Sequence, residues 1–294
     1  MSVAVLRRGL LAQQRLQLRR FASLAASSCS STDSDCVGGS SSSGAQISPP
    51  LPSANSSFYR RPLPASCVAF SSSEGKALFS EALKEGYMEA YFNLAEQFNT
   101  QDEPAYCGLS TLSMILNALE IDPGRTWKGP WRWYHESMLD CCVSLDDIKE
   151  RGISYRELAG LARCNGAACT VRDAAAVSLE DFRRVVQHIT GGGHGRAHLV
   201  INYDRRVLGQ TGKGHFSPIG SYNSRHDMVL VMDTARFKYP PHWVPLETAW
   251  RAMRQIEETT GKGRGFMVFY RQERKGLVFT VCRPAQERWP AVSA

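Results

Sequence analysis

A cysteine stands at the predicted start of a buried helix. Cys107 closes the run Gln101-Asp102-Glu103-Pro104-Ala105-Tyr106-Cys107 and precedes residues 109–119, where leucines recur at helical spacing. The N–H groups and dipole of a helix start favour thiolate, the form of cysteine that attacks carbonyl carbon. The Gln101 side-chain amide, with the backbone N–H of Cys107, would hold the oxyanion of a tetrahedral intermediate. The pattern predicts a nucleophile and its oxyanion hole; the alternative is a cysteine that only packs.

A histidine and an aspartate in two strand-like segments supply a base and a group to orient it. Residues 198–203, 214–222 and 228–233 are rich in β-branched and aromatic side chains and are predicted to be antiparallel strands. A hairpin centred on Ser224 would place His215 directly opposite Asp233, with Cβ atoms about 5 Å apart. A hydrogen bond between Asp233 and one ring nitrogen of His215 would leave the other ring nitrogen free to take a proton from a thiol. This register is an assumption, because a slip of one residue turns one side chain to the opposite face.

Charged residues near these positions suggest a substrate site. Arg236 and Lys238 are predicted to fix carboxylates of an acidic peptide, Arg236 through a bidentate fork. The alternative for both is a role as exposed solubility charges. Glu103 and Tyr106, in the motif of Cys107, are further expected substrate contacts.

Three further cysteines, Cys141, Cys142 and Cys164, are candidates for metal ligands. Their spacings do not match the two-residue separations of zinc ribbons. Small buried hydrophobes are the commoner role for such residues. The nine cysteines, an odd number in a chain without a secretory apolar segment, are not expected to form a disulfide framework.

Composition separates a leader from one domain. Within residues 1–57, the first 32 residues contain five arginines and no acidic residue. The rest of this segment is rich in Ser, Gly and Pro. The first feature is typical of a mitochondrial or plastid transit peptide and the second of a disordered linker. The alternative is a merely disordered N-terminus of a cytoplasmic protein. Arginines interrupt the apolar runs too often for a membrane span, and the basic residues behind the net charge of +7 are scattered, so neither membrane nor nucleic acid is an expected partner.

The domain is expected over residues 58–282, with a short tail over 283–294. Its predicted helices cover residues 76–86, 88–98, 109–119 and 246–258, and further strands are predicted over 266–270 and 276–282. The aromatic cluster of residues 127–134 is assigned to core packing.

Several long motifs resemble those of the phytochelatin synthase family. In chain order they are Tyr59-Arg60-Arg61-Pro62-Leu63-Pro64, Glu103-Pro104-Ala105-Tyr106-Cys107-Gly108-Leu109, Asp122-Pro123-Gly124-Arg125 with Trp127-Lys128-Gly129-Pro130-Trp131-Arg132-Trp133, Gly214-His215-Phe216-Ser217-Pro218-Ile219-Gly220, and Asp233 with Ala235-Arg236-Phe237-Lys238-Tyr239-Pro240-Pro241-His242-Trp243-Val244-Pro245. The resemblance covers about residues 58–282. It implies an α+β, papain-like fold of two lobes, with Cys107 in a helical lobe and His215 and Asp233 in an antiparallel sheet lobe.

The resemblance also implies an activity. Cys107 would be the nucleophile, His215 the base, Asp233 its orienter and Gln101 the oxyanion donor of an acyltransferase acting on glutathione. The enzyme would release glycine, hold γ-glutamylcysteine as a thioester and pass it to glutathione or a growing phytochelatin, for metal detoxification. Cd²⁺ or Zn²⁺ would enter as a thiolate complex with glutathione, and no organic cofactor is expected.

Two alternatives to this transferase stay open. If water takes the acyl group, the chain is a glutathione or glutathione-conjugate peptidase; if there is no chemistry, it is a cysteine-rich metal buffer. The chain ends twelve residues after Cys282, so the cysteine-rich C-terminal domain of plant-type members is expected to be missing, which leaves metal activation open. The oligomeric state is also open, a homodimer included.

Overall fold

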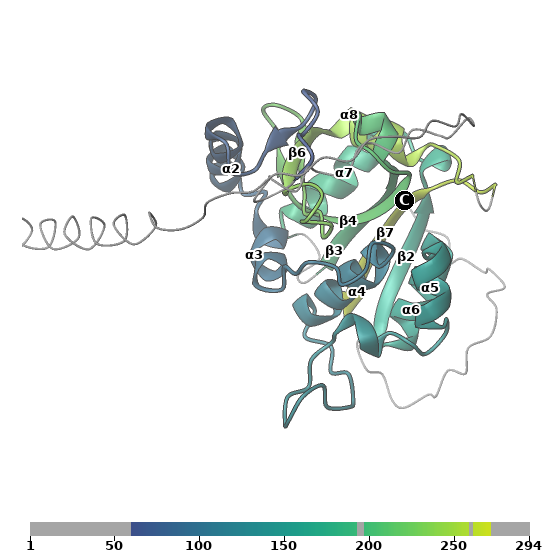
Figure 1. The fold of residues 1–294 in the computed structure, drawn as a ribbon. Coiled ribbons are helices and arrows are strands. Elements are labelled where there is room, and N and C mark those ends of the chain that lie inside the picture. The colour runs from purple at the N-terminus through teal and green to yellow at the C-terminus, as the bar shows by residue number, and fades with distance from the viewer. Residues whose placement is uncertain (1–59, 193–196, 259–260, 272–294) are drawn as a thin grey trace, which may run out of the picture. The chain divides into compact units, whose positions relative to one another are not determined.

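Helices and one antiparallel sheet build the part of the chain that the computed structural model describes, which is residues 60–192, 197–258 and 261–271 (Figure 1). The predicted leader, linker, final strand over 276–282 and tail lie outside these residues. The helices are α2 (Ser73–Glu85), α3 (Glu89–Glu96), α4 (Cys107–Ala118), α5 (Leu145–Arg151), α6 (Tyr155–Cys164), α7 (Leu179–Thr190) and α8 (Leu246–Met253), with short 3-10 turns η1 (Glu136–Met138), η2 (Ala174–Ala176) and η3 (Arg205–Leu208).

The sheet has seven strands in the order β1-β6-β5-β4-β3-β7-β2, and every neighbouring pair is antiparallel. Its strands are β1 (Val68–Ala69), β2 (Ala167–Asp173), β3 (Ala197–Asp204), β4 (Gly214–Asn223), β5 (Met228–Val231), β6 (His242–Pro245) and β7 (Gly265–Arg271). The central strands β3 and β4 therefore carry neighbours on both edges.

Two hydrophobic cores lie on the two faces of the sheet. Val200 of β3 packs in a core with α2, α3, α4 and α6, whereas its neighbours Leu199 and Ile201 pack in a second core with α7 and α8. Successive strand residues point to opposite faces, so a strand covered on both sides is buried along its whole length. Accordingly all eight residues of β3 are buried.

Helix α4 is enclosed on nearly all sides, because ten of its twelve residues are buried. A helix that is apolar all round belongs inside a domain. Gly108, its second residue, permits the close approach, since a Cβ there would lie 2.5 Å from Cγ2 of Ile153. Thr111 donates a hydrogen bond of 3.4 Å to the carbonyl of Phe216 in β4. The sequence thus fixes the first turn of α4, with Cys107, beside the sheet.

The predicted hairpin register is wrong. The β4–β5 connection spans residues 224–227 rather than a turn centred on Ser224, and Asn223 pairs with Met228. Asp227 takes a left-handed conformation with φ of 50°, and the Asn223 side chain accepts a hydrogen bond from the N–H of His226. These turn interactions lengthen the loop, and a further register shift lies between Ile219 and Ser221.

Two other expectations are corrected. The aromatic cluster of residues 127–134 lies mostly outside the core. Trp131 and Trp133 are 69% and 42% exposed, Trp127 is partly exposed, and only Tyr134 of these four aromatic residues is buried. The cluster forms a tight loop in which Lys128 and Trp131 make an isolated bridge, so its rings lie over the surface. The last helix also ends at Met253 instead of residue 258.

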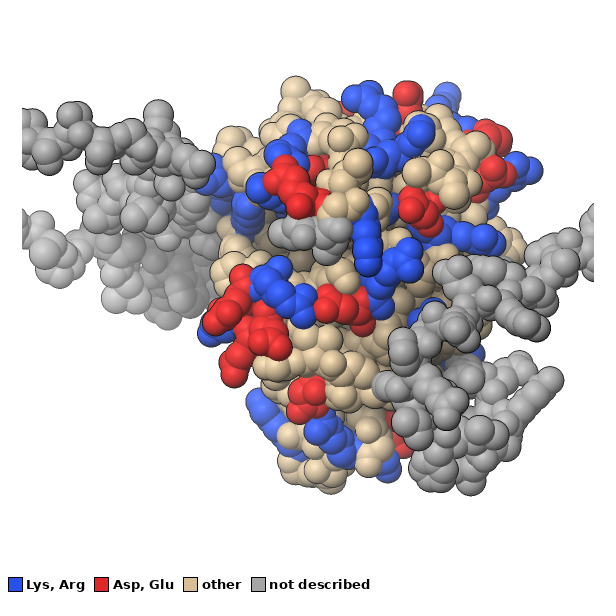
Figure 2. Space-filling model, turned by 90° about the vertical axis from the view of Figure 1, so that its right-hand side faces the viewer, with Lys and Arg blue, Asp and Glu red and all other residues tan. Residues whose placement is uncertain are grey.

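The surface of the described residues carries both signs of charge. On the face in Figure 2, lysines and arginines alternate with aspartates and glutamates. Within the described ranges, no helix combines the length and apolar character needed to cross a bilayer.

Candidate active site

Cys107 is the first residue of α4 and is only partly exposed. Burial raises the pKa of its thiol, but the charge and hydrogen bond of His215 lower it. A hydrogen bond from the backbone N–H of Phe216 and the charge of Arg205 lower it further, so the pKa lies below its ordinary value. The positive end of the α4 dipole acts in the same direction. Cys107 therefore forms the thiolate more readily than an ordinary cysteine does.

His215 near the start of β4 faces Asp233, and its Nε2 lies 2.8 Å from Oδ1 of that carboxylate. With Nε2 occupied, Nδ1 is the nitrogen left for the thiol. Burial lowers the pKa of His215, as does the charge of Arg205, but Asp233 and Cys107 raise it more, and the net shift is upward. Tyr203 packs edge-on to the imidazole with ring centroids 5.8 Å apart. The neighbouring groups thus shift His215 towards imidazolium and Cys107 towards thiolate.

Asp233 reaches His215 diagonally across the two strands. Strand β5 ends at Val231, which pairs with Ile219, and the N–H of Met232 donates to the carbonyl of Pro218 over 3.0 Å. Continuing this register places Asp233 opposite Ser217, two positions from His215. Residues two apart share a sheet face and stay within reach of a diagonal neighbour. The two side chains therefore meet although they are not directly opposite.

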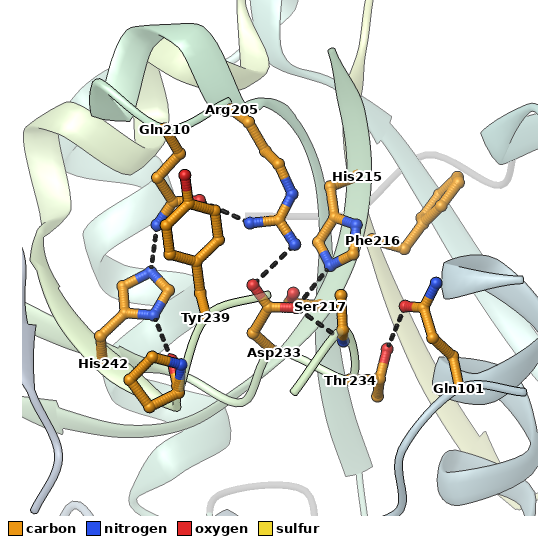
Figure 3. A network of polar contacts seen from close by, with 12 residues as sticks. Gln101, Arg205, Gln210, His215, Phe216, Ser217, Asp233, Thr234, Tyr239 and His242 are labelled. Carbon is orange, nitrogen blue, oxygen red and sulfur yellow. Dashed lines mark hydrogen bonds and ion pairs between the residues drawn. The ribbon is translucent and has the colours of Figure 1, made fainter. Parts of the chain in front are cut away.

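A buried arginine that the sequence analysis missed completes the carboxylate's surroundings (Figure 3). Nη2 of Arg205 donates to Oδ2 of Asp233 over 2.7 Å, and the N–H of Ala235 donates to Oδ1 over 2.9 Å. Burial raises the pKa of Asp233, but the charges of His215 and Arg205 lower it far more, so the carboxylate is ionised. Asp233 is fully buried and Arg205 is 3% exposed. In the sequence, the one signal that could have indicated Arg205 as a site residue is its position directly after a buried strand.

The polar network extends from Arg205 away from Cys107. Nη1 of Arg205 donates to Oε1 of Gln210, whose Nε2 lies 2.8 Å from Nε2 of His242. Nδ1 of His242 donates to the carbonyl of Pro240 over 2.8 Å, so Nε2 is the nitrogen that accepts from Gln210. Burial lowers the pKa of His242, which keeps it neutral in this tautomer. These hydrogen bonds hold the Arg205 guanidinium in place through Nη1, while Nη2 contacts Asp233.

Gln101 ties the loop before Cys107 to the loop that carries Asp233. Its Nε2 donates to the carbonyls of Glu103 and Pro104 over 2.8 and 2.9 Å. Its Oε1 accepts from the Thr234 hydroxyl over 3.3 Å, and its backbone N–H donates to the Thr234 carbonyl. Both amide hydrogens are therefore engaged. The oxyanion role of Gln101 stays a prediction that requires one of these bonds to be exchanged for the substrate oxygen.

Arg236 and Lys238 are placed differently from each other. The guanidinium of Arg236 lies over the Phe98 ring, 4.9 Å from its centroid. Lys238 is half-buried. Its pKa is lowered mainly by burial and also by the charges of Arg205 and Arg61. A desolvated lysine beside two arginines favours an incoming carboxylate.

Glu103 and Tyr106 turn towards α5 instead. The Glu103 carboxylate accepts from Nζ of Lys149 over 2.7 Å, and the Tyr106 hydroxyl donates to the carbonyl of Leu145 over 3.1 Å. Both side chains thus hold α5 against the loop that precedes Cys107.

Cys141, Cys142 and Cys164 come together on the surface. All three are exposed, and their sulfurs lie within 4.8 Å of one another. Cys169, in β2, is not part of this group.

Comparison with known proteins places the chain in a family. A sequence model described as phytochelatin synthase matches residues 58–266. The chain belongs to the phytochelatin synthase family. The resemblance seen in the motifs is thereby confirmed.

Relatives in the family are similar over most of this chain. Glutathione gamma-glutamylcysteinyltransferase 1 from Arabidopsis thaliana is 52% identical over 239 residues, which cover 80% of this chain and 48% of that protein. Glutathione gamma-glutamylcysteinyltransferase from Schizosaccharomyces pombe is 49% identical over 212 residues, which cover 72% and 51%. The chain thus spans about half the length of the curated relatives it matches.

A solved structure was also compared with the fold. A double glycine motif protease from an AMS/PCAT transporter, in complex with a leader peptide, aligns with a TM-score of 0.36 at 16% identity. The alignment covers 59% of this chain and 89% of that one.

Proposed function

We propose that this chain is the catalytic part of a phytochelatin synthase, an acyltransferase that moves γ-glutamylcysteine from glutathione to a second glutathione or to a phytochelatin. The observation that carries the proposal is Cys107, with its pKa lowered, beside a His215 that Asp233 and Arg205 hold in place. Family membership adds the substrate, because the relatives are named for this transfer.

The first half of the reaction forms a thioester. The Cys107 thiolate attacks the carbonyl carbon between the cysteine and glycine of glutathione, and the carbonyl oxygen becomes an oxyanion. The backbone N–H of Cys107 stabilises that oxygen, together with Gln101 once its amide is released. His215, protonated in the resting pair, gives its proton to the leaving amino group of glycine. The carbon–nitrogen bond breaks, and γ-glutamylcysteine remains on the sulfur.

The second half transfers the acyl group. The α-amino group of a second glutathione attacks the thioester carbonyl, and neutral His215 takes the proton that this amine loses. The carbon–sulfur bond breaks, which restores the thiolate beside the imidazolium and leaves a longer γ-glutamylcysteine peptide. Asp233 keeps Nδ1 of His215 directed at the reacting atoms during both steps.

The cations near Asp233 suit an acidic peptide. Glutathione carries two carboxylates, and Lys238, whose charge is disfavoured by burial and by the nearby charges of Arg205 and Arg61, is the first proposed carboxylate partner. Arg236, whose guanidinium lies over Phe98, is the second proposed carboxylate partner. In this proposal Cd²⁺ or Zn²⁺ enters with its substrate as a glutathione thiolate complex, since thiolates prefer soft divalent metals.

For the architecture, we propose the papain-like arrangement of two lobes. The helices from α2 to α6, with Cys107, would form one lobe, and the sheet with His215 and Asp233 the other. The support is the separation of the two hydrophobic cores by the sheet and the meeting of α4 with β4 at the reacting pair.

Product analysis tests the transferase against its rivals. The chain is incubated with glutathione and Cd²⁺, and the products are separated and identified by mass. We expect free glycine together with peptides containing two or more γ-glutamylcysteine units. Glycine and γ-glutamylcysteine alone would overturn the transferase and identify a peptidase. Cys107→Ser is the matched control and should release no glycine; a metal buffer would release none in either form.

A further inference from the structure

Two consecutive backbone N–H groups hold the loop that precedes Cys107. The N–H of Gln101 donates to the carbonyl of Thr234 over 3.1 Å, and the N–H of Asp102 donates to Oε2 of Glu136 over 3.0 Å. Thr234 belongs to the loop after β5, whereas Glu136 is the first residue of η1. The backbone of residues 101 and 102 is therefore held from two separate parts of the fold.

Glu136 is a costly residue to bury. It is 2% exposed, and its Oε1 has no hydrogen-bond partner among the residues that the structure describes. The Ser110 hydroxyl lies nearby, but it donates its hydrogen to Oδ1 of Asn99 over 2.9 Å. A buried acid with an unsatisfied oxygen destabilises a fold, and such costs concentrate at functional sites. The hydrogen bond that Glu136 does accept, from the N–H of Asp102, connects it to the loop before the nucleophile.

His135, directly before Glu136, contacts the side chain of Asp102. Nδ1 of His135 accepts from the N–H of Ser137 over 3.3 Å, so Nε2 carries the ring hydrogen and faces Oδ2 of Asp102 at 3.4 Å. Trp127 stacks on the imidazole, with ring centroids 5.8 Å apart. Both side chains of the His135–Asp102 pair are more than a third exposed, and exposed ion pairs contribute little. The buried carboxylate of Glu136 is therefore the main support that η1 gives to the loop.

The hydrogen bond to Glu136 keeps the backbone in place while the Gln101 side chain changes partners. Nε2 of Gln101 donates to the carbonyls of Glu103 and Pro104, and a role as oxyanion donor requires one of these bonds to be given up. A donor serves a developing charge only when it is held within about 0.5 Å of the productive geometry. Because the N–H groups of residues 101 and 102 are both held, rotation of the side chain alone can redirect the amide.

We propose that Glu136 is a positioning residue of the acyl transfer: through the N–H of Asp102 it holds Gln101 where its amide can meet the oxyanion formed at Cys107. This inference rests on the proposed function and adds a residue to the same site. Glu136 acts through the loop and exchanges no proton with the substrate. Because the oxyanion develops only in the transition state, loss of the hydrogen bond should lower kcat and kcat/KM together and leave KM nearly unchanged.

Steady-state kinetics of glycine release from glutathione tests this role in the full chain. Glu136→Met has a similar length but no acceptor for the N–H of Asp102, whereas Glu136→Gln keeps an amide oxygen there. In Glu136→Met we expect kcat to fall about 10- to 100-fold with little change in KM, as for a small misplacement of a catalytic group. Glu136→Gln should retain the kcat of the parent, as should Glu150→Met, which replaces an exposed glutamate of α5. An unchanged kcat in Glu136→Met, or an equal fall in Glu136→Gln, would overturn the proposal.

Hydrogen exchange measured by mass spectrometry tests the contact without substrate. The segment of residues 99–106 should exchange faster in Glu136→Met than in the parent or in Glu136→Gln, and equal exchange in all three would contradict the anchoring role. If Glu136→Met does not fold, Glu136→Asp replaces it; its shorter carboxylate should not reach the N–H of Asp102, so kcat should again fall, and an unchanged kcat would refute the role. A parent chain that releases no glycine would overturn the proposed function together with this role. Glycine release by the parent with unchanged kcat in the variants would overturn this inference alone.

Discussion

Arg205 donates from Nη2 to Oδ2 of Asp233 over 2.7 Å, on the side of the carboxylate away from His215. Both members of this ion pair are buried, so either charge alone would be costly inside the protein. Asp233 therefore lies between two cations and has little freedom to turn. Arg205 acts on the reacting pair through this carboxylate and through its own charge, which makes it a positioning residue.

The charge of Arg205 should set the pH range of the enzyme. It lowers the pKa of both Cys107 and His215. In Arg205→Met both pKa values should rise, so both limbs of the pH profile of kcat/KM for glycine release should move to higher pH. Arg205→Lys keeps the charge but loses the fork that holds Asp233 and Gln210, so kcat should fall about 10- to 100-fold with little displacement of the profile. A profile that Arg205→Met leaves in place would show that the arginine is only structural.

The lowered pKa of Cys107 should be visible in alkylation. Iodoacetamide reacts with thiolate, so the folded protein should be modified at Cys107 at a pH where free glutathione reacts slowly. In His215→Ala the largest lowering influence is lost, and the midpoint of the rate against pH should move upward. Peptide mapping by mass identifies the modified cysteine. Cys107 labelling that follows the pH dependence of free glutathione would contradict the thiolate assignment.

Local pattern predicts those elements whose apolar spacing is itself local. Helices α2, α3 and α4 and strands β3 and β4 lie within a few residues of the ranges expected from periodicity. The order of the sheet is a different matter, because β7 inserts between β3 and β2 although it is the last strand among the described residues. Pairing between strands that are distant in sequence depends on how the whole domain buries its apolar surfaces, and no short stretch of sequence encodes it.

The same distinction holds for the site. Cys107 and His215 could be named because a helix start and a strand give each of them a context. Arg205 lies in a short 3-10 turn after β3 and Gln210 lies two residues beyond that turn, and isolated polar residues at such positions have no periodic signal. The register of Asp233 was wrong because side-chain hydrogen bonds in the 224–227 loop, rather than strand composition, set the hairpin length.

Gln101 ties two loops together, and its proposed role as an oxyanion donor can be separated from that tether by mutation. Gln101→Ala removes both, and we expect kcat for glycine release to fall about 100- to 1000-fold, as for loss of one oxyanion donor. Thr234→Val removes only the hydrogen bond to Oε1 of Gln101 and should cost less than about tenfold. The two variants are compared by steady-state kinetics, with thermal midpoints as a check on folding. Equal losses in both would assign Gln101 to the tether alone.

Glu136 is a buried acid beside the loop that precedes Cys107. It is 2% exposed, and its Oε2 accepts from the N–H of Asp102 over 3.0 Å. Burial raises the pKa of Glu136 to about 7, and the nearby charges of Asp102 and Glu103 act in the same direction. The native chain therefore binds a proton here that the unfolded chain, with an ordinary glutamate, has already lost.

This difference predicts how stability depends on pH. An acid whose pKa is raised on folding stabilises the native state below its unfolded pKa, near 4.5, and that contribution is lost as pH rises through about 7. Glu136→Gln mimics the protonated acid, so its free energy of unfolding should match the parent at pH 5 and exceed it at pH 8 by about 1–3 kcal/mol. Urea unfolding at both pH values measures the difference. Replacing the exposed Glu150 by Gln is the control, and its free energy of unfolding relative to the parent should be nearly the same at both pH values. A pH-independent effect of Glu136→Gln would refute the raised pKa, because only ionisation of Glu136 between pH 5 and pH 8 makes the stabilities of the two proteins diverge.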